Sequence, residues 1–257
     1  MEALLDDFEP VFNTLGESIE TAFANYQEPA GTHEEIESRA DQDHVANTGK
    51  LSLSSQPIWP EGVEIDTASD VTYLTVNERL LIMELNKVRS NPSLYAELYL
   101  EPMLKRYRGR NLERPGEITI LTQEGAAAVN ECISALQNAN PVGLLFPREG
   151  LSKAAADHVS DQGPTGKTGH SGSDGSSLAD RVERYGEWDI TIGENIDYGH
   201  SDPAQIVAAL LIDDGVPSRG HRKNVLNDKF GYVGVAIDHH AKYGYMCVMD
   251  LAGSYKE

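Results

Sequence analysis

The residues best suited to chemistry lie between His170 and His221, two histidines that each stand beside a glycine. Between them are Glu194, in a Gly-Glu-Asn turn, and the pair Asp213 and Asp214, at the end of a predicted helix. Two imidazoles and two carboxylates from separate elements can bind a divalent metal ion or transfer protons. The sequence therefore predicts that these side chains converge in one site.

The placement of the acids favours a functional role. Glu194 lies in a stretch with β-type residues, where a carboxylate is a poor choice for packing and needs a cation, a histidine or backbone donors. Asp213 and Asp214 end a helix, where negative charge opposes the helix dipole. At least one of them is therefore expected to pair with a histidine, an arginine or a metal. Arg219 and Arg222 are nearby partners for a purely structural ion pair.

Each histidine also has an ordinary structural explanation. His170 lies in a glycine- and serine-rich loop, and His221 follows a helix and a proline turn, as a surface residue would. His158, on a predicted alanine-rich helix, is interpreted as a packing residue or as one that supports the site from behind. His239 and His240 fall in a predicted hairpin turn, where we expect a solvated pair.

The familiar catalytic signatures are absent from the sequence. The stretch GHSGS lacks the last glycine of a GxSxG elbow, and there is no HExxH helix, P-loop or dinucleotide fingerprint. Hydrolysis stays open in two forms. Glu194 could act as general base on a metal-bound water, or Ser171 beside His170 could be a nucleophile without a metal.

Charge and composition exclude several classes of protein. The net charge is −20 over 257 residues, and an acidic surface repels phosphate backbones, so no nucleic-acid partner is expected. No run of roughly 18 apolar residues predicts a transmembrane helix. No signal peptide is visible, which indicates a cytoplasmic protein or a mature chain with an added Met. Cys132 and Cys247 could pair once, or both could be small buried hydrophobes.

Two parts with different composition are predicted. Residues 1–72 form an acidic N-terminal extension, and residues 1–70 hold 16 acidic residues against only Arg39 and Lys50. Within it, residues 10–26 carry an apolar stripe at helical spacing, followed by a polar linker. This helix either docks on the main domain or mediates protein contact or self-association. A further possibility is that the extension is the functional part and the domain, residues 73–257, displays it.

The pattern of elements in the domain predicts an α+β fold. A capping box at Thr75 and Glu78 begins the first helix. The C-terminal part then changes to two β-type runs with a short link, the first of which alternates at Val233, Val235 and Ile237. Two such runs must be antiparallel neighbours. Helices followed by a hairpin favour α+β over a doubly wound parallel sheet. The expected helices cover about 76–88, 92–104, 123–140, 149–161, 177–185 and 203–214, and the strands 231–238 and 245–253.

The segments GHSGSDGSS, RVERYG, IGENIDYG and SRGHRKNVL, in this order, resemble the CAP superfamily, whose name comes from cysteine-rich secretory proteins, antigen 5 and pathogenesis-related 1 proteins. The resemblance covers roughly residues 73–255 and is greatest to the bacterial-type branch. It implies an SCP-like domain, a three-layer α-β-α sandwich with a central antiparallel sheet. The chain lacks the many cysteines of animal and plant members, so their disulfides are not expected here.

The resemblance also implies a central cleft with two histidines and two acids. His170 and His221 match the two histidines, and Glu194 matches the acid of the Gly-Glu-Asn motif. Asp213 falls at the place of the remaining acid, with Asp214 as the alternative. The tryptophan that precedes this acid in the family is replaced here by a leucine.

The resemblance also implies that the protein is secreted, periplasmic or located at the cell surface. Some family members bind sterols or other lipids, and some hold zinc or another divalent ion between the histidines. We therefore expect a non-catalytic module that binds a divalent metal, with zinc as the expected ion, and a lipid or other small ligand. His170 and His221 would bind the metal, and a metal-assisted peptidase or esterase with Glu194 as general base is the alternative. The residues expected to support these two histidines from behind are Glu194, Asp213, Asp214 and His158.

Overall fold

Three long strands form the centre of the computed structural model, which describes Trp59 and residues 64–113 and 118–257. The order in this sheet is β4-β6-β7-β5. The hairpin of β6 and β7 confirms the two predicted strands, and β5 pairs antiparallel with the other side of β7. The two-residue β4 adds a parallel edge to β6. The bounds are β4 Phe146–Pro147, β5 Glu187–Tyr198, β6 Tyr232–His240 and β7 Gly244–Lys256.

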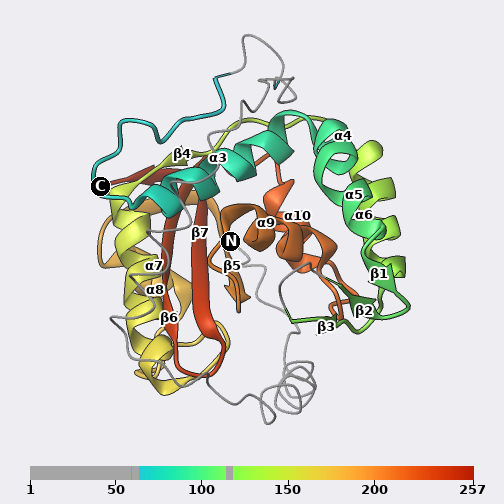
Figure 1. Cartoon of the computed structure of the whole chain (residues 1–257). Helices are drawn as coiled ribbons and strands as arrows, with labels where there is room; N and C mark the ends of the chain where they lie inside the picture. The colour runs from blue at the N-terminus through green and yellow to red at the C-terminus, as the bar shows by residue number, and fades with distance from the viewer. Residues whose placement is uncertain (1–58, 60–63, 114–117) are drawn as a thin grey trace, which may run out of the picture. The chain divides into compact units, whose positions relative to one another are not determined.

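Helices cover both faces of this sheet (Figure 1). On one side α7 contacts β6 and β7, and α8 contacts β5. On the other side α3 contacts β6, while α9 and α10 contact β5. The predicted α+β fold, a three-layer α-β-α sandwich, is therefore confirmed. The bounds are α3 Val76–Ser90, α7 Glu149–Gln162, α8 Leu178–Glu183, α9 Pro203–Ile212 and α10 Gly220–Val225.

Local capping explains where the helices begin. Thr75 and Glu78 form the predicted capping box of α3, and Ser177 forms a second one at α8. Asn91 accepts from the Leu94 amide at the start of α4. No helix in the described ranges is both long enough and apolar enough to cross a bilayer. The remaining helical segments are α4 Pro92–Tyr95, the π-helical η1 Ala96–Leu100, α5 Glu101–Leu104, α6 Ala126–Gln137 and the 3₁₀ turn η2 Gly163–Thr165.

The predicted helix at 10–26 and most of the linker lie outside the described residues, and the division at residue 72 stays a prediction. The residues just before that division pack on the domain. Asn86 Nδ2 donates to the Ile65 carbonyl at 3.0 Å, and Thr67 Oγ1 donates to the Leu145 carbonyl at 2.6 Å.

The structure contains elements that periodicity did not reveal. These are most of β5, the short α10, and a small sheet of β1 Tyr107–Arg108, β2 Asn111–Leu112 and β3 Ile120–Leu121. β5 was missed because Glu194 interrupts the apolar positions of its alternating sequence, and α10 was missed because it has only six residues and begins with glycine.

The prediction of a solvated pair at residues 239 and 240 is wrong for His240, which is fully buried. Its Nδ1 accepts from the Tyr243 amide at 3.1 Å, and its Nε2 donates to the Lys167 carbonyl at 2.8 Å. Backbone groups of the turn and of Lys167 thus satisfy both ring nitrogens, which permits burial. Cys132 and Cys247 are both free and buried, as small hydrophobes would be.

Gly234 of β6 lies where α7 crosses the sheet. A Cβ at this position would meet the Leu151 carbonyl carbon at 2.0 Å and the Ser152 nitrogen at 2.1 Å. Because these are helix backbone atoms, they cannot rotate away. We expect Gly234→Ala to lower the free energy of unfolding by roughly 1–3 kcal/mol or more, measured by urea unfolding. Gly143→Ala, where a Cβ meets nothing within 4 Å, is the control; equal effects of the two changes would contradict the close approach.

Candidate functional site

A buried acid of β5 orients His170. The His170 Nδ1 lies 2.7 Å from Glu194 Oε1, and the side chains are 38% and 3% exposed, respectively. A carboxylate acceptor holds the imidazole proton on Nδ1, which leaves the lone pair of Nε2 for another partner. The structure thus brings these two predicted residues together and makes Glu194 an orienting group.

Arg181 of α8 completes this first pair, and sequence reasoning missed it. Its Nη2 donates to Glu194 Oε2 at 2.6 Å, with both side chains almost fully buried, and its Nη1 donates to the His170 carbonyl at 3.0 Å. Burial alone would raise the pKa of Glu194. The hydrogen bond from His170 and the charge of Arg181 outweigh it, so the pKa lies below its usual value. The signal was present in the RVERYG segment.

His158 supports the His170 loop from α7. Its Nε2 donates to the Gly169 carbonyl at 2.8 Å, and Gln162 donates to the same oxygen at 2.9 Å. The Tyr198 hydroxyl accepts from the Gly169 amide at 3.0 Å. Burial lowers the pKa of His158, which favours its neutral form. The predicted supporting role therefore acts on the backbone next to His170.

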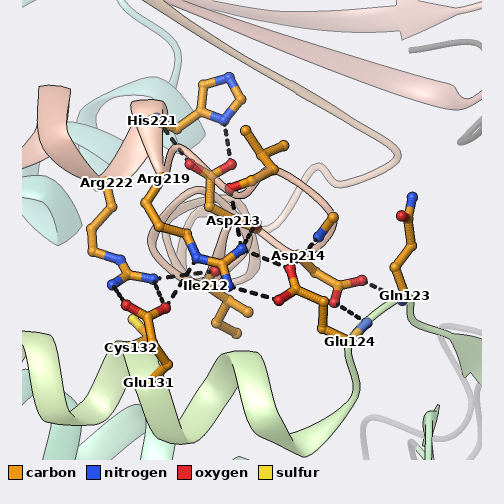
Figure 2. Close-up of polar contacts among 12 residues, drawn as sticks. Gln123, Glu124, Glu131, Cys132, Ile212, Asp213, Asp214, Arg219, His221 and Arg222 are labelled. Atoms are coloured by element: carbon orange, nitrogen blue, oxygen red, sulfur yellow. Dashed lines mark hydrogen bonds and ion pairs between the residues drawn. The ribbon is translucent and has the colours of Figure 1, made fainter. Parts of the chain in front are cut away.

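A second buried acid orients His221 in the same way (Figure 2). The His221 Nδ1 lies 2.7 Å from Asp213 Oδ1, and its backbone amide donates to Asp213 Oδ2 at 3.0 Å. The Asp213 side chain is 2% exposed. The residue adopts the left-handed conformation, φ 55°, that ends α9. The ring again directs Nδ1 at the acid, and Figure 2 shows its opposite edge pointing away.

Asp214, the alternative candidate for the acid that contacts His221, has a structural role. Its carboxylate accepts from the backbone amides of Gln123 at 2.6 Å and Glu124 at 2.8 Å (Figure 2). It therefore joins the turn after α9 to the segment before α6. The structure places Asp213, and not Asp214, on His221.

Arg219 and Arg222 pair with glutamates of the α6 region rather than with the aspartate side chains (Figure 2). Arg219 contacts Glu124 at 2.7 Å and Glu131 at 3.0 Å, and also donates to the Asp213 carbonyl at 2.7 Å. Arg222 makes two contacts with Glu131, each 2.7 Å. These structural ion pairs fix the turn that carries Asp213 and His221.

Strand β5 links the two histidine–acid pairs. Asn195, next to Glu194, donates to the His221 carbonyl at 3.1 Å, and Asn224 donates to Asn195 Oδ1 at 2.9 Å. Successive residues of a strand point to opposite faces. β5 is also an edge strand of its sheet. His170 is therefore held from the α7–α8 side and His221 from the α9–α10 side of this edge strand.

The donor set left for a metal is small. Glu194 and Asp213 are committed to the histidines, so the Nε2 atoms are the groups that remain. Within residues 64–113 and 118–257, no group of three or more His, Cys, Asp or Glu side chains is placed to hold a metal ion. A pocket of about 270 Å³ among the described residues lies beside α3, and neither histidine lines it. It is lined by Asp66, Ser69, Val76, Arg79 and Leu80.

Two solved structures are similar to part of the chain. An extracellular protein containing an SCP domain, from Bacillus anthracis str. Ames, has 22% identity and a TM-score of 0.35, covering 48% of this chain and 37% of its own. An outer surface protein from Borrelia burgdorferi has 16% identity and a TM-score of 0.36, covering 49% and 86%. No curated protein matches the chain.

The family match carries the assignment. The model of the cysteine-rich secretory protein family (CAP) matches residues 85–251. That range runs from within α3 to within β7 and includes both histidine–acid pairs. It confirms the resemblance inferred from the sequence motifs. The chain belongs to the cysteine-rich secretory protein (CAP) family.

Proposed function

We propose that this domain is a non-catalytic binding module that takes a divalent metal ion, with zinc as the expected ion, through Nε2 of His170 and His221. The supporting observation is that each histidine gives its Nδ1 to a buried carboxylate, at 2.7 Å in both cases. This pairing fixes the tautomer and ring orientation that metal-bound histidines have. When bound, the ion would act as a Lewis acid on water or a small ligand in its open positions.

The same contacts disfavour the hydrolase alternative. A general base must lie within hydrogen-bond reach of the water that it deprotonates. The Glu194 side chain is buried away from solvent, and its two oxygens already accept hydrogen bonds from His170 and Arg181. Ser171 is exposed, and among the described residues its hydroxyl makes no hydrogen bond to His170.

Other aspects of the proposal rest on family membership. Three further features fit a CAP protein whose described helices do not span a membrane. They are a lipid or small ligand, a secreted, periplasmic or surface location, and a protein partner for the helix predicted at residues 10–26. With two protein donors, the proposed metal site is expected to bind more weakly than a structural zinc site with four.

Isothermal titration of chelator-treated protein with zinc tests this proposal. We expect about one ion per chain, with binding lost in His170→Ala and in His221→Ala. Asp213→Asn, which leaves both donors in place, should weaken binding about 10–100-fold. His239→Ala is the matched control, because that histidine is exposed and outside the site. Binding that survives both substitutions at His170 and His221 would refute the proposed site.

A further inference from the structure

A further buried acid, which orients neither histidine, lies beside Glu194. Asp250 of β7 is fully buried and stands in register with Glu194 on β5 and Gly234 on β6. Directly opposite residues of antiparallel strands project from the same face, so the two carboxyl groups share the face that α7 covers. Neither carboxyl oxygen of Asp250 receives a hydrogen bond from a donor among the described residues.

The surroundings of Asp250 supply one cation for two acids. Glu194 from β5, Arg181 from α8 and Tyr255 from its own strand interact with it electrostatically. His158 from α7 interacts with Glu194, and burial favours its neutral form. The register neighbour on β6 is a glycine, which brings no side chain. Arg181 is the only permanent cation in this set, so a second buried negative charge would be uncompensated.

The two acids differ in their donors. Glu194 is hydrogen-bonded to both His170 and Arg181, which stabilises its ionised form. Asp250 has no such donor, and burial first and the negative Glu194 second raise its pKa well above the usual value.

We propose that Asp250 is a neutral carboxylic acid at neutral pH and a positioning residue, whose hydroxyl donates to the Glu194 carboxylate and holds it against His170. Asp250 thereby adds a third donor to an acid that already receives two. The protonation state does not depend on the proposed metal site, whereas an effect on zinc affinity rests on that proposed function.

Asp250→Asn tests the protonation state, because asparagine keeps the shape and a donor but cannot ionise. The pKa of Asp250 in the folded state is raised, so above the unfolded value of about 3.9 the unfolded chain loses a proton that the native protein keeps. Wild-type stability then falls as the pH rises, until the pH passes the folded pKa. The folding constant of the variant relative to wild type should therefore rise about tenfold per pH unit, or about 1.4 kcal/mol, above roughly pH 5.

A stability difference that is independent of pH between about 5 and 7 would overturn the proposal. Carbon-13 NMR of the wild-type Asp250 carboxyl group checks the same point without a variant. Its chemical shift should remain that of the protonated acid across this range, and a titration to the ionised shift near pH 4 would contradict the proposal.

Nitrogen-15 NMR of the His170 ring tests the positioning role. Asp250→Asn should keep the proton on Nδ1, whereas Asp250→Ala should shift part of the population to the other tautomer. Val248→Ala, a buried apolar change on the same strand and face, is the control for lost packing. If both alanine variants leave the tautomer unchanged, Asp250 does not position Glu194. If the NMR results hold but wild type binds no zinc, the proposed function fails and this inference stands.

Discussion

Replacing Arg181 with methionine is expected to lower the free energy of unfolding by about 3–5 kcal/mol, because it leaves a buried carboxylate without its cation. Arg181 and Glu194 are 2.6 Å apart, with side chains 2% and 3% exposed. The pKa of Glu194 is lowered in the folded state, so its contribution is present at neutral pH and is lost on acidification. The cost of the substitution should therefore shrink as the pH falls. Urea unfolding between about pH 4 and 8 measures both effects.

The control for this substitution is the residue directly after the same helix. Arg184 bridges Asp157 and Asp174, but its side chain is 40% exposed. Arg184→Met should cost no more than about 1 kcal/mol. Equal costs for the two arginines would show that burial does not set the strength of the Arg181 contact.

Arg89→Ala is expected to destabilise the domain by about 3–5 kcal/mol, through the lost side-chain volume and the carbonyl oxygens left without donors. Arg89 is fully buried. Its guanidinium donates to the carbonyl oxygens of Gly143 at 2.7 Å, Val225 at 2.7 Å, Asn227 at 3.0 Å and Phe230 at 2.7 Å. Three of these follow or end α10, so the loss should also loosen the helix that carries His221. Thermal and urea unfolding measure the stability.

Two variants make this second test specific. Arg89→Lys keeps the charge but lacks the planar fork, so it should fall between alanine and wild type. Arg79→Ala removes an arginine on the same helix that donates to the Ser69 carbonyl in an exposed contact, and should have little effect. A wild-type-like Arg89→Ala would mean that the four carbonyl groups find other donors.

Local signals explain why the fold was predictable. The Thr75 capping box and the β-type runs of β6 and β7 depend on neighbours within a few positions, and both occur as predicted. The segment motifs likewise marked His170, Glu194 and His221. Sequence neighbours alone did not show which of Asp213 and Asp214 contacts His221. The left-handed conformation of Asp213 decides this, because it directs Asp213 to His221 and Asp214 to the segment before α6.

Residues whose roles depend on tertiary register could not be assigned in advance. Arg181 precedes Glu194 by 13 residues, and only the packing of α8 on β5 brings their side chains together. Asp250 carried a usable signal, a lone acid within the apolar run CVMDLAG. Its relation to Glu194 required the pairing of β5 with β7. His240 was misassigned because its burial depends on backbone groups of the turn and of Lys167.

The central claim is that two carboxylate-held histidines present Nε2 to one shared ion. Nitrogen-15 NMR of the imidazole rings, recorded without and with one equivalent of zinc, tests it most directly. We predict protonated Nδ1 atoms on His170 and His221 in both states, and a zinc-dependent shift of both Nε2 signals at the same stoichiometry. A shift of one ring alone, of neither ring, or at Nδ1 would contradict the account.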